Sequence, residues 1–120
     1  MTISVVLVAI IALLHIYILY LEMFLWATPK GQKAFGTTAQ VAQDSKGLAF
    51  NQGLYNGFLA AGLIWGIFYP DGAVGRQIQL FFLSCVLIAG IVGSLTAKRS
   101  ILYIQAVPAL LAIVAVLMKW

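Results

Sequence analysis

The sequence has 120 residues, of which 63% are hydrophobic and only 8% are charged, and its formal net charge is +4. Soluble domains contain about 45–50% apolar and about 25% charged residues, and small ones bury only roughly 60–70% of their surface, so this composition excludes water as the main solvent. The charge pattern argues against nucleic acid as a partner, because the few basic residues adjoin apolar runs and form no basic stripe interleaved with aromatic side chains.

Four apolar runs are long enough, or nearly so, to cross a bilayer as helices. They cover about residues 3–26, 48–69, 76–96 and 101–118. A hydrocarbon core about 30 Å thick needs roughly 20 apolar helical residues, and the runs lack the alternation of a membrane barrel. We therefore predict an all-α, integral membrane four-helix bundle that forms a single transmembrane domain over residues 1–120.

The connections between these runs differ in length. Short turns are expected after helices two and three, at residues 69–72 and 98–100, because proline and glycine in the first favour a tight turn. The first connection, residues 28–47, is long and is predicted to be cytoplasmic. Thr28-Pro29 is expected to end the first helix, since proline disfavours a helical conformation in the residue before it.

Part of the long connection is predicted to be helical. Thr37 and Gln40 have the spacing of a capping box, in which two side chains satisfy free backbone N–H groups at a helix start. Helix two is therefore expected to begin near Thr38 and to continue into the apolar run.

The distribution of basic residues predicts the orientation. One side of the bundle carries Lys30, Lys33, Lys46, Lys98 and Arg99, whereas the other carries Arg76 and Lys119. Basic residues accumulate on the cytoplasmic side of membrane proteins. We therefore expect the first and third connections in the cytoplasm and both termini outside.

Two ionisable residues lie within the first apolar run. Glu22 is near its cytoplasmic end, and His15 is seven residues earlier on the same helical face. Ionisable residues inside a membrane are candidates for function. Glu22 is a candidate proton acceptor or ligand contact, and its alternative role is a structural hydrogen bond to helix two. A proton relay from His15 to Glu22 is possible in principle, although a structural histidine is the favoured interpretation.

Helix two is expected to begin with a polar arc. Asn51, Gln52, Tyr55 and Asn56 share a broad surface of this helix, more polar than helix association normally requires. Gly53 and Gly57 are expected on a different face, where their spacing permits close packing against another helix.

Helix four adds Tyr103 and Gln105 near its cytoplasmic start. Pro108 cannot donate a hydrogen bond to the carbonyl of Ile104 and is expected to kink the helix, and repair of that defect is the alternative role of Gln105. The polar residues of helices one, two and four all fall in the cytoplasmic half and predict one polar pocket there. The candidate ligand-binding residues are Glu22, Asn51, Gln52, Tyr55, Asn56, Tyr103 and Gln105.

Known reaction and cofactor motifs do not appear in the sequence. Cys85 is the single cysteine and His15 the single histidine, so no metal site is expected. Neither a phosphate-binding glycine loop nor a nucleophile–base set is present. No cofactor can be named, and whether the chain is an enzyme is left open.

The run from Asn51 to Ala60, with Glu22 before it and Trp65-Gly66 after it, resembles a family of small bacterial membrane proteins described only as a domain of unknown function. The resemblance covers essentially the whole chain. It implies a multi-pass protein of the bacterial cytoplasmic (inner) membrane.

A more distant likeness, in architecture, is to the membrane-associated proteins of eicosanoid and glutathione metabolism. These are trimers of four-helix chains with a long cytoplasmic first loop. Asn51 and Tyr55 match polar residues of their second helix, but Gln43 and Leu54 replace its glutamates and Gly47 its arginine. The likeness implies the architecture and not glutathione binding.

Three functions remain open at this stage. The favoured one is binding of a lipophilic or amphiphilic ligand in a polar pocket of the cytoplasmic leaflet. The alternatives are a scaffold or partner membrane subunit without its own chemistry and a small proton-coupled exporter. The expected partners are the lipid bilayer and further copies of the chain, because small-residue faces on helices two and three favour a homo-oligomer, with a trimer preferred.

Overall fold

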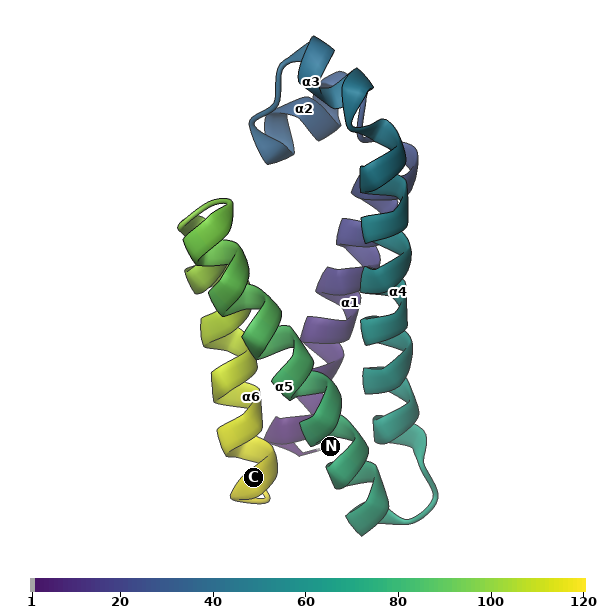
Figure 1. The fold of residues 1–120 in the computed structure, drawn as a ribbon. Helices are drawn as coiled ribbons and strands as arrows, with labels where there is room; N and C mark the ends of the chain where they lie inside the picture. Colours follow the sequence, from purple (N-terminus) through teal and green to yellow (C-terminus); the bar gives the residue numbers. More distant parts are fainter. Residues whose placement is uncertain (1) are drawn as a thin grey trace. The chain divides into compact units, whose positions relative to one another are not determined.

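The computed structural model describes residues 2–120, and every regular element among them is a helix, which confirms the all-α prediction. In chain order these elements are α1 (Ile3–Phe24), α2 (Pro29–Phe35), α3 (Ala39–Asp44), α4 (Lys46–Phe68), α5 (Gly72–Thr96), the π-helix η1 (Leu102–Ala106) and α6 (Val107–Leu117) (Figure 1).

The chain divides into two compact units. One comprises Met1–Leu13 with Leu59–Trp120, and the other comprises Leu14–Phe58. The long helices α1 and α4 each contribute to both units, and the two units are described separately below. The single transmembrane domain expected from the sequence remains a prediction.

Apolar side chains of four helices form the core of the first unit. Its buried members are Val8, Ile11, Ala12, Leu63, Leu83, Val86, Ala109, Ala112 and Val116. Alanines recur at every third position of α6, and this small-residue face is fully buried. Such faces allow helix backbones to approach closely, and α5 packs along η1 and α6 in an antiparallel hairpin (Figure 1).

The connection after α1 is more helical than the sequence analysis predicted. Thr28 has an extended backbone and its hydroxyl accepts a hydrogen bond from the N–H of Gly31, so Thr28 caps α2 and Pro29 opens it. Proline is favoured at the first position of a helix. The Thr28-Pro29 pair therefore begins a helix, whereas α1 has already ended at Phe24.

The predicted capping box at Thr37 and Gln40 is wrong by one residue. Thr38 is the N-cap of α3, where its hydroxyl accepts a hydrogen bond of 3.2 Å from the N–H of Val41. The side chain of Gln40 instead donates to Asp44 across 2.9 Å. Helix α3 ends there, and α4 begins separately at Lys46.

The turn at residues 69–72 also starts a helix earlier than expected. One carboxylate oxygen of Asp71 accepts hydrogen bonds from the N–H groups of Ala73 (2.8 Å) and Val74 (3.2 Å). Aspartate is a strong N-cap because it satisfies free donors of the first turn. Helix α5 consequently begins at Gly72 rather than near residue 76.

The expected kink in the fourth apolar run takes the form of a wider helix. Residues Leu102–Ala106 form the π-helix η1, and Pro108 follows in the first turn of α6, where its missing N–H is tolerated.

Two helices, Ile3–Phe24 and Gly72–Thr96, are long and apolar enough to cross a membrane by length and composition, within the described residues. Leu102–Leu117 is a shorter apolar stretch. Helix α4 has 23 residues and carries amide side chains in its first half, and it does not meet the same criterion. Two of the four expected spans are thus supported on this criterion.

Candidate functional site

Glu22 forms the centre of the candidate site in the unit of residues 14–58. It lies in the last two turns of α1, and only 7% of its surface is exposed. The side-chain amide of Asn56, on α4, donates a hydrogen bond of 2.5 Å to the Glu22 carboxylate. This contact confirms the expectation that Glu22 faces an amide of the second long helix.

The orientation of Asn56 is fixed by its own helix. Its amide nitrogen carries two hydrogens, and it also donates to the backbone carbonyl of Gln52 across 3.2 Å, one turn earlier. Both donor positions of Asn56 are therefore used, one within α4 and one toward Glu22.

Two glycines allow α4 to lie this close to α1. A Cβ atom at Gly53 would lie 2.5 Å from Cγ of Met23 and 3.1 Å from Cβ of Glu22. A Cβ atom at Gly57 would lie 2.7 Å from Cδ1 of Leu19. A side chain at Gly53 would be tightly contacted, and one at Gly57 would displace the end of the Leu19 side chain, which confirms that Gly57 packs against another helix.

The single polar arc predicted for helix two is divided in the structure. At 3.6 residues per turn, Asn56 lies between Gln52 and Gly53 around the helix axis, at the border of the glycine face, and so it points toward α1. Asn51 and Gln52 remain exposed, as does Tyr55, whose ring lies 6.0 Å from that of Phe58. The prediction that Asn56 and the glycines occupy different faces is therefore wrong.

His15 is fully buried within α1. Its position seven residues before Glu22 keeps both on one side of the helix. Transfer of a proton from one to the other remains a prediction.

Tyr103 and Gln105 belong to the other unit. Gln105 is partly buried, and its amide donates to the carbonyl of Val86 on α5 across 3.1 Å. Gln105 therefore links η1 to α5. Its amide does not replace the hydrogen bond to the Ile104 carbonyl that Pro108 cannot donate. Tyr103 has 66% of its surface exposed.

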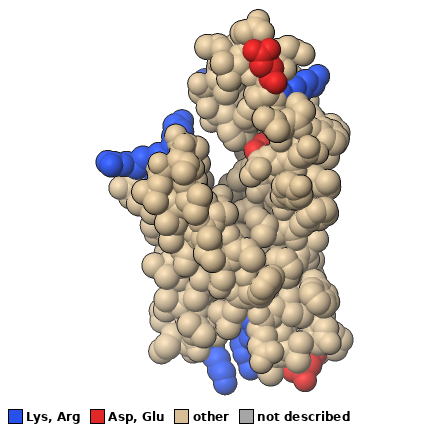
Figure 2. Space-filling model, viewed as in Figure 1, with Lys and Arg blue, Asp and Glu red and all other residues tan. Residues whose placement is uncertain are grey.

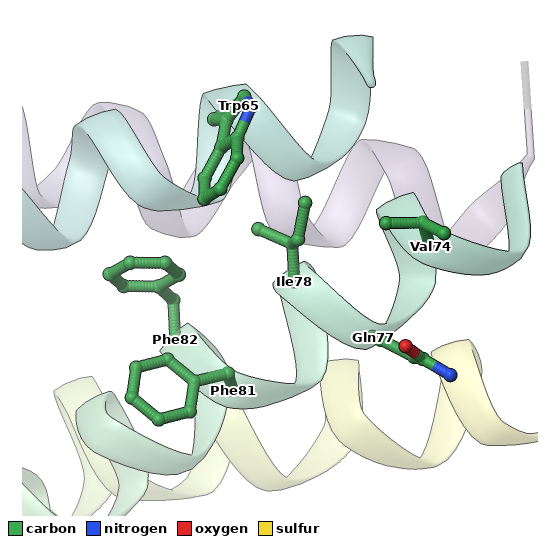
Figure 3. Close-up of a pocket in the computed structure, with 6 residues that line it drawn as sticks. All are labelled: Trp65, Val74, Gln77, Ile78, Phe81 and Phe82. Carbon is green, nitrogen blue, oxygen red and sulfur yellow. The ribbon is translucent and has the colours of Figure 1, made fainter. Parts of the chain in front are cut away.

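A shallow apolar cavity in the same unit was not predicted. It has a volume of about 320 Å³ and is lined by Trp65 on α4 and by Val74, Gln77, Ile78, Phe81 and Phe82 on α5 (Figure 3). None of the candidate ligand-binding residues lines it. The adjacent aromatic residues Phe81 and Phe82 are a sequence feature that could have indicated it.

Gln79 was also missed. It is buried in α5, and its amide donates to the carbonyl of Gly66 on α4 across 3.1 Å. An isolated amide within an apolar run is the feature that could have revealed this link.

Comparison with known proteins identifies the family. The family model described as "Protein of unknown function (DUF1304)" matches residues 9–117. An uncharacterized protein, YpaA, of Lactococcus lactis subsp. lactis (strain IL1403) is 31% identical over 114 residues, which cover 93% of this chain and 94% of the relative. No solved structure matches the chain. The chain therefore belongs to the DUF1304 family, which confirms the resemblance to a bacterial domain of unknown function.

Proposed function

We propose, from this family membership and the geometry of the site, that the chain is a multi-pass protein of the bacterial cytoplasmic membrane that binds a lipophilic or amphiphilic ligand. Its polar contacts would come from Glu22, Asn56 and the neighbouring exposed groups of α4. One observation carries the proposal. The buried carboxylate of Glu22 accepts a hydrogen bond from Asn56, and the amide side chains of Asn51 and Gln52 on the same helix α4 are exposed.

The surface of the long helices supports a membrane environment. Large apolar side chains are exposed along them, including Leu13, Phe24, Phe81, Leu95 and Leu117. Soluble monomers rarely expose extensive apolar surface. In the α5–α6 hairpin the basic side chains gather at the two ends and leave an uncharged band between them (Figure 2).

The exposed amides argue for an amphiphile. Asn51 and Gln52 lie on a helix whose neighbouring side chains Leu48, Leu54 and Phe58 are apolar and exposed. Polar side chains facing lipid need a partner, because hydrocarbon offers them no hydrogen bond. A ligand with a polar head and an apolar tail would cover both kinds of surface.

The test is to identify what co-purifies with the protein. Mass spectrometry of the purified full chain should detect a bound amphiphile, and the Glu22→Gln variant should fold but lose most of it. Asp44→Asn is a matched control, because it makes the same acid-to-amide change at an exposed position. Equal amounts of ligand in wild type and Glu22→Gln, or no amphiphile with the wild type, would contradict the proposal.

Self-association is the second candidate, and the same exposed α4 surface favours it. A homo-oligomer, with a trimer expected, would cover Asn51 and Gln52 with a second copy of α4, and the chain would then act as a scaffold or partner subunit. A Leu54→Cys variant in a Cys85→Ser background should cross-link in native membranes. A variant that yields only monomer would exclude this arrangement.

A further inference from the structure

A second cavity lies in the unit of residues 1–13 and 59–120, where α5 begins. Its volume is about 230 Å³, and its lining includes the cationic side chains Arg76 and Lys119 and the aromatic side chains Tyr69 and Trp120. Pockets for drug-sized ligands have volumes of about 300–1,000 Å³. The cavity therefore fits a small polar group better than a whole amphiphile.

The two cations in the cavity are not neutralised by nearby side chains. Within the described residues, neither Arg76 nor Lys119 forms an ion pair within 4.0 Å. Asp71 is the acidic side chain nearest in sequence to Arg76, and one of its carboxylate oxygens accepts from two backbone N–H groups as the N-cap of α5. An external anion would therefore not have to displace an ion pair of Arg76 or Lys119.

Hydrogen bonds between sequence-distant segments hold one wall of the cavity. The N–H (3.3 Å) and hydroxyl (3.1 Å) of Ser4 both donate to the main-chain oxygen of Trp120. Because that hydroxyl proton is used, the 3.2 Å contact between Thr2 and Ser4 has Thr2 as its donor. Both hydroxyl protons are therefore used within the chain.

Lys119 is held in an unusual backbone conformation. Its φ angle is 57°, and it follows α6 at the position where the N–H of Trp120 bonds back to the carbonyl of Ala115 (3.0 Å). This pattern is a Schellman motif, whose left-handed residue is usually glycine. A lysine at this position is conformationally unfavourable, and such residues concentrate at functional sites.

Arg76 folds back over the first turn of α5. A Cβ atom at Gly72 would lie 3.7 Å from Nη1 of Arg76, an ordinary contact distance, so the guanidinium lies beside this first turn. Guanidinium and ammonium groups are the usual protein ligands of phosphate.

We propose that this cavity binds a phosphate group, carried by an anionic phospholipid headgroup or by free phosphate, with Arg76 and Lys119 as its donors. Tyr69 and Trp120 suit a headgroup, because tyrosine and tryptophan are enriched where membrane meets water. The proposal does not depend on the ligand at Glu22, which lies in the other unit.

The test measures binding to the purified full chain in detergent. The probes are dioleoylphosphatidylglycerol, dioleoylphosphatidylcholine as the zwitterionic lipid with the same acyl chains, and inorganic phosphate against chloride at equal ionic strength. Arg76→Gln and Lys119→Gly should each weaken phosphatidylglycerol binding about fivefold, which corresponds to about 1 kcal/mol for each cation near a membrane surface. Lys119→Gly also suits the left-handed backbone, so this variant is expected to fold.

Matched controls come from the opposite end of the same hairpin. Lys98→Gln and Arg99→Gln remove exposed cations outside the cavity and should leave phosphatidylglycerol affinity unchanged. Binding of inorganic phosphate as well as phosphatidylglycerol would identify phosphate itself as sufficient, and binding of the lipid alone would identify the headgroup as the source. Wild-type affinity in both cavity variants, an equal loss in the controls, or no binding of either probe would overturn the proposal.

Discussion

The side-chain amide of Asn56 lies 2.5 Å from the carboxylate of Glu22 and joins α4 to α1. Gly53 permits this contact, because a side chain there would crowd Met23, Glu22 and the Leu19 carbonyl of α1, and one at Gly57 would displace the end of the Leu19 side chain. The polar pair and the small residues are therefore two parts of one helix contact within residues 14–58.

The first prediction concerns the loss of the amide. Asn56→Ala should lower the stability of the folded protein by about 1–3 kcal/mol, because it leaves a buried acceptor without its donor. Asn51→Ala removes the same chemical group from an exposed position and should change stability by less than about 0.5 kcal/mol. Unfolding in detergent, followed by circular dichroism, compares the two variants. Equal stability would show that the Asn56 contact contributes nothing.

The second prediction concerns the close approach of the helices. Gly53→Ala adds a methyl group against Met23 and Glu22 and should destabilise by about 1–3 kcal/mol through overpacking. Gly47→Ala makes the same change in the same helix, but no atom lies within 4 Å of the new methyl group. It should be neutral or stabilising by up to about 1 kcal/mol, since alanine is the better helix former. If Gly53→Ala is tolerated as well as Gly47→Ala, the helices are not in close contact there.

Local sequence features explain most of the helix boundaries, including those assigned wrongly. Asp71 and Thr28 cap helices by bonding N–H groups two or three residues later, and these caps can be recognised from sequence. The errors arose because each was interpreted from its neighbouring proline as part of a turn or a helix end. Proline is compatible with both a helix end and a helix start.

Contacts between distant segments could be predicted only in part. The depth of Glu22 in an apolar run indicated that it needs a polar partner, but choosing Asn56 over Asn51 requires the rotation of α4 about its axis. Gln105 illustrates the same limit, because its acceptor on Val86 depends on how η1 packs against α5. Hydrophobic periodicity gives weak information on rotation when a helix is apolar on nearly every side.

The third prediction tests that packing of α5. A Cβ atom at Gly90 would lie 2.9 Å from the backbone nitrogen and 3.0 Å from Cβ of Ala106. Gly90→Leu should therefore force η1 away from α5 and destabilise the protein by about 1–3 kcal/mol or more. Ala89→Leu adds a side chain of the same size at an exposed neighbouring position and should be tolerated. Thermal unfolding of both variants in the same detergent gives the comparison, and similar midpoints would contradict the packing of Gly90 against Ala106.

The fourth prediction is the orientation in the membrane. Five basic residues lie in the two connections that we place in the cytoplasm, and two lie on the other side. Basic residues are retained on the cytoplasmic side during insertion, so this imbalance should set the topology.

In a Cys85→Ser background, Lys33→Cys in α2 and Pro70→Cys before α5 place one exposed thiol on each side. A membrane-impermeant maleimide is applied to cells whose cytoplasmic membrane is intact and accessible from outside. It should label position 70 and not position 33. Detergent should then make both positions reactive, which shows that the unlabelled thiol was protected by the membrane and not by folding. Labelling of position 33 alone before detergent would reverse the topology, and it would place the Glu22–Asn56 site near the outer surface.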